Sequence, residues 1–255
     1  MRHKTKDKGD LGVAKTIPHL LEHSIRCCLP LSEHLPFDLI AVMPDFTTLC
    51  RVQVKYRAAK NGIIEIPFRS NYYDSKRIYS KRVNFDEIDC YSVYCPDTDK
   101  VYYLRIDEIH ETAIAVHLRL APARNGQIKG IRLAADFDNP RRIASSVQSR
   151  QVFRRDVTEL DELVISKVSA VLVGTGVQPC PAASQYLPFD LIAVPPDMKT
   201  LQRIRVGWGN VEQTAYADQY AVYDPLMQQC LFFEADKLPP ERIRSASKIA
   251  QRIYS

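Results

Sequence analysis

The sequence predicts an α/β protein with two tandem domains, the second a degenerate and shortened copy of the first. The block LPFDLIAV occurs at Leu35–Val42 and again at Leu187–Val194. Residues 35–54 match residues 187–206 at 14 of 20 positions without a gap, at a constant offset of 152. A chain of 255 residues is also long enough for two compact domains. We expect a first domain at 1–138, a basic linker at 139–157 and the copy at 158–255.

The first copy is expected to begin with an amphipathic helix. Apolar residues recur there at spacings of three and four: Leu11, Ala14, Ile17 and Leu21. Asp10 is the expected N-cap, and Pro18 is expected to kink or restart the helix. The offset of 152 pairs Asp10 with Glu162, so a carboxylate stands at the predicted helix start in both copies.

Alternating and β-branched stretches predict a series of strands after this helix. In the first copy they are Phe37–Val42, Leu49–Tyr56, Gly62–Arg69, Ile88–Pro96 and Lys100–Ile106, and in the second Ala217–Pro225 and Cys230–Phe233. These last two match the first copy at an offset of 129 instead of 152. The second copy has therefore lost 23 residues, which correspond to a basic, tyrosine-rich loop of the first.

That basic segment, Arg69–Arg82, carries five cations and one anion, interleaved with three tyrosines. Such a composition suits contact with phosphates together with stacking on bases. We therefore expect contact with a nucleic acid, through Arg69, Lys76, Arg77, Lys81 and Arg82. The alternative is a solvated, mobile loop without a ligand. The basic linker is a second segment that could follow a phosphate backbone.

Composition limits the class of protein. A hydrophobic share of 45% and a charged share of 25% are typical of soluble globular proteins. No apolar run reaches the roughly 18 residues of a membrane span, and the charged N-terminus is not a secretory signal. Seven cysteines without a C-x-x-C pair fit reduced thiols. We expect a cytoplasmic protein with no membrane partner.

Four residues of the first copy have the chemistry of a metal-dependent phosphodiesterase. Asp38 is the expected central carboxylate, Gln53 a neutral oxygen ligand and Asp10 a second carboxylate, a set that suits Mg²⁺. Lys55 shares a strand face with Gln53, so its ammonium can point at the phosphate or the attacking water. A Gln-x-Lys tripeptide is common in half-exposed strands. However, the second copy has Arg205 and Gly207 in place of this pair, which favours a catalytic role in the first.

Other residue patterns give weaker evidence for a metal or nucleotide site. His19 and His23 stand four apart, but Glu22 is not in the H-E-x-x-H position and no third ligand is evident, so we expect surface or core histidines. The sequence contains neither of the two glycine-rich nucleotide-binding motifs, which argues against nucleotide-driven chemistry.

Several motifs together resemble the PD-(D/E)XK nuclease superfamily. They are Gly9-Asp10-Leu11-Gly12, Phe37-Asp38-Leu39-Ile40, Arg51-Val52-Gln53-Val54-Lys55 and the run from Asp89 to Tyr103 that contains Val-Tyr-Cys-Pro-Asp-Thr-Asp-Lys. The resemblance spans about residues 8–137 and is greatest to the group I intron-associated homing endonucleases. It implies restriction-endonuclease-like domains, each with a mixed central sheet flanked by helices.

Carried over residue by residue, the resemblance implies Asp10 in the helix-borne acidic position and Asp38 in the metal-binding position. Gln53 takes the place of the usual second acid, and Lys55 is the catalytic lysine. The chain departs from the common form in having Phe37 where proline precedes the aspartate, and Gln53 instead of Asp or Glu. The intron-associated branch shares this glutamine.

The resulting hypothesis is a DNA endonuclease of the homing type or a related one, with one active site per chain and Mg²⁺ as cofactor, for which Mn²⁺ is a possible substitute. This hypothesis makes double-stranded DNA the expected partner. A homodimer or higher oligomer would then be needed to cut both strands. The alternatives are a non-catalytic DNA-binding protein derived from a nuclease, and a structure-specific nuclease that acts on branched DNA such as junctions.

Overall fold

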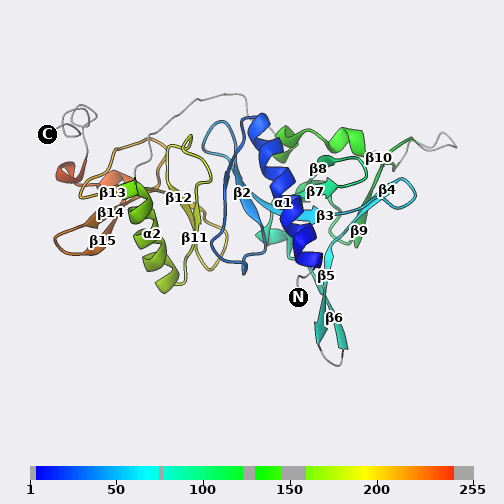
Figure 1. The fold of residues 1–255 in the computed structure, drawn as a ribbon, viewed down its shortest axis with the longest axis horizontal. Coiled ribbons are helices and arrows are strands. Elements are labelled where there is room, and N and C mark those ends of the chain that lie inside the picture. The colour runs from blue at the N-terminus through cyan, green and yellow to red at the C-terminus, as the bar shows by residue number, and fades with distance from the viewer. Residues whose placement is uncertain (1–3, 75–76, 123–129, 145–158, 244–255) are drawn as a thin grey trace. The chain divides into compact units, whose positions relative to one another are not determined.

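The computed structural model describes residues 4–74, 77–122, 130–144 and 159–243, which form a mixed α/β fold (Figure 1). The chain divides into two compact units. The first comprises Met1–Ile25, Pro36–Met43 and Cys50–Gln148, and the second comprises Arg26–Leu35, Pro44–Leu49 and Ser149–Ser255. All seven cysteines are free, as their spacing predicted. Among the described residues, no helix combines the length and the apolar character needed to cross a bilayer.

Helix α1 (Lys4–Glu22) opens the first unit and packs on strands β7 and β8 through its buried face, where Leu20 is fully enclosed. The helix begins six residues before Asp10, so the prediction of Asp10 as N-cap is wrong. Residues 4–9 show no apolar periodicity, yet lysine is a strong helix former and Asp7 in the first turn favours the helix dipole. Pro18 lies inside the helix, which continues to Glu22 as one element.

The main sheet has the strand order β1-β2-β3-β7-β8. Its strands are β1 (Arg26–Cys28), β2 (Leu39–Val42), β3 (Leu49–Tyr56), β7 (Cys90–Cys95) and β8 (Lys100–Arg105). Strand β7 runs parallel to β3 and antiparallel to β8. The sequence located β3 to the residue, because alternation of buried and half-buried positions runs through the whole strand.

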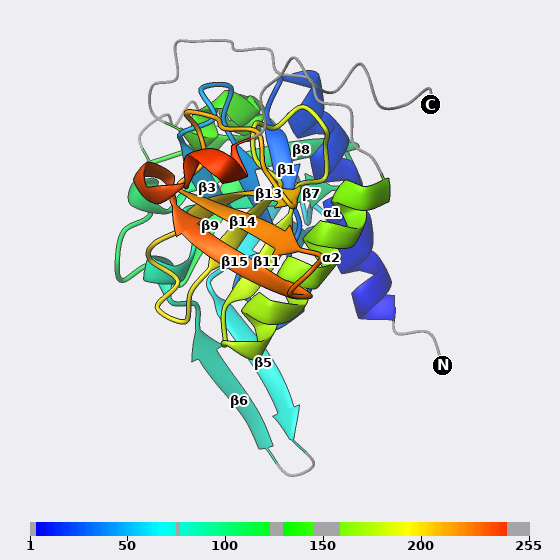
Figure 2. The ribbon, with the colours of Figure 1, turned by 90° about the vertical axis from the view of Figure 1, so that its left-hand side faces the viewer.

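The first unit contains a small sheet and a hairpin that have no counterpart among the second unit's described residues. Strands β4 (Ile63–Pro67), β9 (Ala115–Arg119) and β10 (Arg132–Leu133) form a small sheet. Strands β5 (Arg69–Asp74) and β6 (Arg77–Arg82) pair as an antiparallel hairpin that projects from the first unit (Figures 1 and 2). The basic segment expected as a loop is therefore a β-hairpin.

The second unit repeats this plan in reduced form. Helix α2 (Glu159–Gly174) packs on a sheet of order β11-β12-β13-β14-β15. The strands are β11 (Gln178–Pro181), β12 (Leu191–Val194), β13 (Gln202–Trp208), β14 (Gln219–Asp224) and β15 (Gln229–Glu234). Val164, Val168 and Leu172 of α2 join the buried core above this sheet. Only ten residues separate β13 from β14, against 33 between β3 and β7.

The two sheets also share their pairing register. Strands β3 and β7 pair in parallel from Val52↔Cys90 to Tyr56↔Tyr94. Strands β13 and β14 pair in parallel from Ile204↔Gln219 to Trp208↔Tyr223. The five paired positions of one sheet correspond to those of the other at the offsets of 152 and 129 found in the sequence.

Within the second unit, residues 27–31 run antiparallel beside residues 179–183. The Leu29 N–H donates to the Pro181 carbonyl at 3.0 Å. Leu31 N–H donates to Pro179 O (3.3 Å) and Ala183 N–H donates to Cys27 O (2.9 Å), two bonds whose donors and acceptors correspond at the offset of 152.

The linker expected at 139–157 lies mostly outside the described residues. Its first part forms a short 3-10 helix, Pro140–Ile143, in which Pro140 and Ile143 are buried. These residues belong to the first unit.

Candidate active site

Asp38 and Gln53 are in direct contact. Asp38 precedes β2, and its backbone N–H donates to the Val52 carbonyl on β3 at 2.9 Å. The Asp38 Oδ2 atom accepts hydrogen bonds from Gln53 Nε2 and from the Val54 N–H, each at 2.6 Å. Asp38 Oδ1 accepts no hydrogen bond from the residues that the structure describes. One carboxylate oxygen is thus anchored to the strand, and the other remains for a ligand.

Burial raises the pKa of Asp38, against the opposing effects of the Val54 and Gln53 hydrogen bonds and the Lys55 charge. A half-buried carboxylate has lost part of its hydration, and a bound divalent ion replaces the lost water dipoles with a positive charge. A carboxylate with a free oxygen next to an amide side chain is also an oxygen donor set of the kind that Mg²⁺ and Mn²⁺ prefer. The residues present therefore fit a divalent metal ion.

Lys55 lies on the same strand face as Gln53 and is half-buried. Its Nζ atom lies 5.8 Å from the centre of the Tyr91 ring on β7. Burial lowers the pKa of Lys55, while the charge of Asp38 raises it. The pKa of Lys55 is lowered on balance, and the face of the Tyr91 ring and the charge of Asp38 oppose this shift by favouring the ammonium form.

Asp10 is not joined to Asp38, Gln53 or Lys55 by any hydrogen bond or ion pair, and its side chain is exposed on α1. The helix does approach the end of β3 closely. A Cβ atom added at Gly12 would meet Val54 Cγ1 at 3.1 Å and the Lys55 backbone at 3.8 Å. Because Val54 faces α1, Gln53 and Lys55 point to the other face. The role of Asp10 stays a prediction.

Of the expected DNA contacts, Arg69 is exposed at the start of β5. Arg77, Lys81 and Arg82 belong to β6, but their side chains, like the whole of Lys76, lie outside the described residues. Their role in binding stays a prediction.

The matching position of the second unit keeps the aspartate and replaces its neighbours. The Asp190 Oδ2 atom accepts from the Val206 N–H at 2.7 Å, and the Asp190 N–H donates to Ile204 O at 2.9 Å, as Asp38 does in β3. Arg205 takes the position of Gln53. Its Nη1 atom lies 3.7 Å from Asp190 Oδ2, and its Nη2 lies 3.0 Å from Glu212 Oε2.

Gly207 takes the position of Lys55. A Cβ atom built on Gly207 would lie 2.1 Å from the Asn210 carbonyl oxygen, so the backbone of the short β13–β14 connection fills the space of a side chain. Lysine is excluded there unless this connection moves.

Each of the two sheets also contains an arginine–aspartate ion pair next to this position, which the sequence analysis did not predict. Arg51 donates from Nε and from its backbone N–H to Asp89 Oδ2, and from Nη2 to Asp89 Oδ1. Arg203 and Asp218 repeat all three bonds. Each pair fastens the central strand to the start of its parallel neighbour. Comparison of the two copies could have predicted this pair, since the arginine recurs at the offset of 152 and the aspartate at the offset of 129.

A family model described as PD-(D/E)XK endonuclease matches residues 3–140. Among solved structures, the chain is similar to a bacterial homing endonuclease, I-Ssp6803I, with 20% identity over 53% of this chain and 88% of that chain and a TM-score of 0.44. No curated protein matches. Because the family model covers more than half of the chain, including Asp38, Gln53 and Lys55, the protein belongs to the PD-(D/E)XK endonuclease family.

Proposed function

We propose that the chain is a DNA endonuclease of the homing type or a related one, which hydrolyses phosphodiester bonds with Mg²⁺ at a single site in its first unit. The observation that carries this proposal is the anchored Asp38 carboxylate, which accepts a hydrogen bond from Gln53 and interacts electrostatically with Lys55. This set lies in the segment that matches the family model. Mn²⁺, which prefers similar ligands, should substitute for Mg²⁺.

The free Oδ1 of Asp38 would hold the ion, whereas Asp10 lies on α1, which packs on the opposite face of β3, and would need a movement of the helix to reach it. Gln53 now presents its amide nitrogen to Asp38, and rotation of the amide by half a turn would bring its carbonyl oxygen to the same place. A bound divalent ion polarises the phosphoryl oxygen and lowers the pKa of its water. Lys55, held beside Asp38, would orient the attacking water or stabilise the charge that develops on the phosphate.

The second unit, roughly residues 158–255, is proposed to be a degenerate copy without catalysis. Two independent features support this. The guanidinium of Arg205 supplies a fixed positive charge 3.7 Å from Asp190, which disfavours a metal ion there by repulsion. In addition, Gly207 offers no amine, and the Asn210 backbone fills the space that one would need.

A chain with a single active site hydrolyses one strand of a DNA duplex. A monomer is therefore expected to nick duplex DNA, and cleavage of both strands is expected to need two chains. The segment Arg69–Arg82 is the proposed DNA contact, through Arg69, Lys76, Arg77, Lys81 and Arg82, because a segment with five cations can follow a phosphate backbone.

The test is relaxation of supercoiled plasmid, with Mg²⁺ or with EDTA. Asp38→Asn and Lys55→Met keep the size of each side chain and should each lower the nicking rate by about 100-fold or more. Asp190→Asn is the matched control, since it makes the same change in the second unit and should leave nicking intact. Full activity in Asp38→Asn, or equal loss in both aspartate variants, would refute a single site in the first unit.

A second candidate is a DNA-binding protein without catalysis, which the loss of Gln and Lys from the second unit favours. It predicts salt-sensitive DNA binding with no metal-dependent nicking. A nuclease for branched DNA would instead cut a four-way junction in preference to linear duplex, so both substrates and RNA belong in the same assay.

A further inference from the structure

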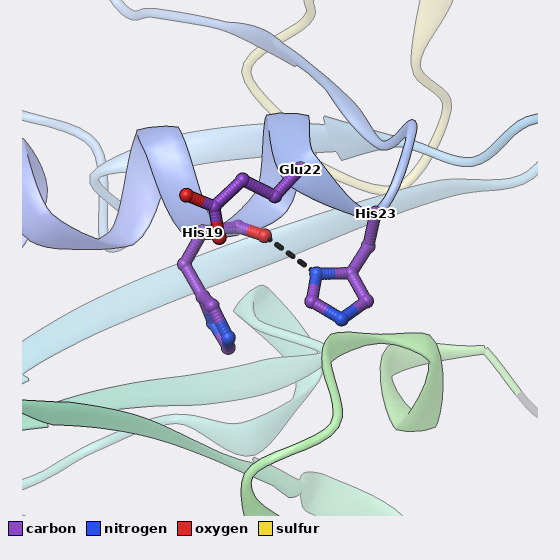
Figure 3. A group of neighbouring side chains, drawn as sticks. All are labelled: His19, Glu22 and His23. Atoms are coloured by element: carbon purple, nitrogen blue, oxygen red, sulfur yellow. Dashed lines mark hydrogen bonds between the residues drawn. The ribbon is translucent and has the colours of Figure 1, made fainter.

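Three metal-ligating side chains gather on the last turn of α1, away from the site just described. One ligand atom each from His19, Glu22 and His23 can be chosen so that all lie within 4.8 Å of one another. Figure 3 shows both imidazole rings projecting from this turn, with the Glu22 carboxylate alongside. Residues at i, i+3 and i+4 share one helix face, which explains the convergence. The cluster escaped the sequence reasoning because that sought a glutamate next to the first histidine.

The hydrogen bonds of the two histidines leave one nitrogen of each for a ligand. His23 Nδ1 lies 2.9 Å from the His19 carbonyl oxygen. A carbonyl only accepts, so this nitrogen carries the proton and Nε2 keeps its lone pair. His19 Nδ1 lies 3.0 Å from the Tyr103 hydroxyl, and its ring stacks on Tyr103 at 5.7 Å. The hydroxyl can accept a proton from Nδ1, which frees Nε2 in the same way. Metal-bound histidines are commonly oriented by such bonds.

A cavity of about 380 Å³ adjoins two of the three side chains, where water can complete a coordination shell. His19 and Glu22 line it together with Lys15, Lys100 and Asp138, and His23 lies outside its lining. Ligands at about 2.1 Å from a tetrahedral ion stand about 3.4 Å apart, so ligand atoms that lie within 4.8 Å of one another must close by about 1.4 Å at most. Glu22 is exposed and can rotate to do so.

We propose that His19, Glu22 and His23 bind a divalent transition-metal ion of the Zn²⁺ class, at a site distinct from the Mg²⁺ site at Asp38. Two imidazoles and one carboxylate select Zn²⁺, Co²⁺ or Ni²⁺ over Mg²⁺, whose preferred ligands are all oxygen. The two sites lie on opposite faces of the sheet, because α1 covers the face that Val54 presents and Gln53 points to the other.

The experiment titrates the untagged full chain with Co²⁺, monitored by visible absorption, and with Zn²⁺ against a chromophoric chelator. All proteins carry Asp38→Asn, which removes the carboxylate of the nuclease site. We expect one equivalent of ion per chain. His23→Ala and Glu22→Gln should each weaken binding by tenfold or more, as should His19→Ala. His117→Ala, a change at an exposed histidine of β9, is the matched control and should bind as the parent does.

Binding equal in His23→Ala and His117→Ala, or no stoichiometric binding in the parent, would overturn the proposal. His19 contacts Tyr103, so His19→Ala could also disturb the fold. Glu22 is exposed, so weaker binding in Glu22→Gln would report loss of a metal ligand without a change in packing. Because the nuclease proposal is tested through Asp38 and Lys55, failure of one proposal leaves the other standing.

Discussion

Gln53 and Arg205 occupy the same position in two sheets of identical register: Gln53 is paired with Tyr91 on β7, and Arg205 with Tyr220 on β14. Each side chain reaches an aspartate that is anchored by the next backbone N–H of its own strand. The first unit thus places a neutral amide beside its aspartate, and the second a permanent cation. Asp38 therefore has an uncharged side chain at the position where Asp190 has a guanidinium.

Exchange of these two residues gives the first prediction. Gln53→Arg should bring a guanidinium next to Asp38 and reduce metal-dependent nicking by about 100-fold or more. Arg205→Gln should leave nicking unchanged, since Gly207 still offers no amine. It should change the free energy of unfolding by less than about 1 kcal/mol, because glutamine can donate to Asp190 as Gln53 does to Asp38. Nicking by Gln53→Arg at the parental rate would contradict the proposed ion site.

The crowded backbone at Gly207 gives the second prediction. Gly207→Ala forces a methyl group to within 2.1 Å of the Asn210 oxygen, and should lower the free energy of unfolding by about 3 kcal/mol. Gly174→Ala, at the end of α2, meets no atom within 4 Å and should be neutral or stabilise by up to about 1 kcal/mol. Urea denaturation measures both, and equal effects of the two changes would show that the Asn210 backbone yields freely.

A buried pair of hydroxyl groups gives the third. Thr16 on α1 and Ser92 on β7 are 2.7 Å apart and fully buried, whereas the equivalent positions of the second unit hold Val168 and Ala221. Thr16→Val or Ser92→Ala alone leaves the other buried hydroxyl without its hydrogen-bond partner, and should lower the free energy of unfolding by about 1–2 kcal/mol. The double variant should cost less than either single change, because the second unit packs this apolar pair in its core. Additive losses in a double-mutant cycle would count against this.

The raised pKa of Asp38 gives the fourth. Metal binding requires the carboxylate, so affinity for Mn²⁺ should fall, as pH is lowered, at a higher pH than for an ordinary aspartate. The metal-free protein should behave oppositely. Its folded state binds the proton more tightly than the unfolded chain, so stability should rise as pH falls through the raised pKa, and Asp38→Asn should lack this gain. Parallel curves for both proteins just above the usual aspartate range would contradict the shift.

The sequence predicted those parts of the fold in which pattern and packing agree. Strand β3 was located to the residue because every second side chain points to the core. The start of α1 was missed because residues 4–9 are helical without an apolar stripe, and the β5–β6 hairpin was taken for a loop because its charges masked its pairing. Strands β1 and β11, of three and four residues, are too short to show a period.

The site was predictable to the level of residue type and strand face. Alternation places Gln53 with Lys55, and the repeat marks Asp38, but no local pattern states that the Val54 N–H anchors the carboxylate, since this depends on how β2 approaches β3. The Arg51–Asp89 pair joins residues 38 positions apart, beyond the reach of periodicity. Only comparison of the two copies could have revealed it.

The packing at Gly207 would make the proposed inactivity of the second unit hard to reverse. Recovery of a lysine needs the Asn210 backbone to withdraw, recovery of an ion needs Arg205 to change, and neither step yields any activity without the other. A variant with only one of these changes would gain no activity, so selection would not favour it as a step toward recovery. Once closed in this way, the second half is free to diverge toward other tasks, while the first alone remains under pressure to conserve its chemistry.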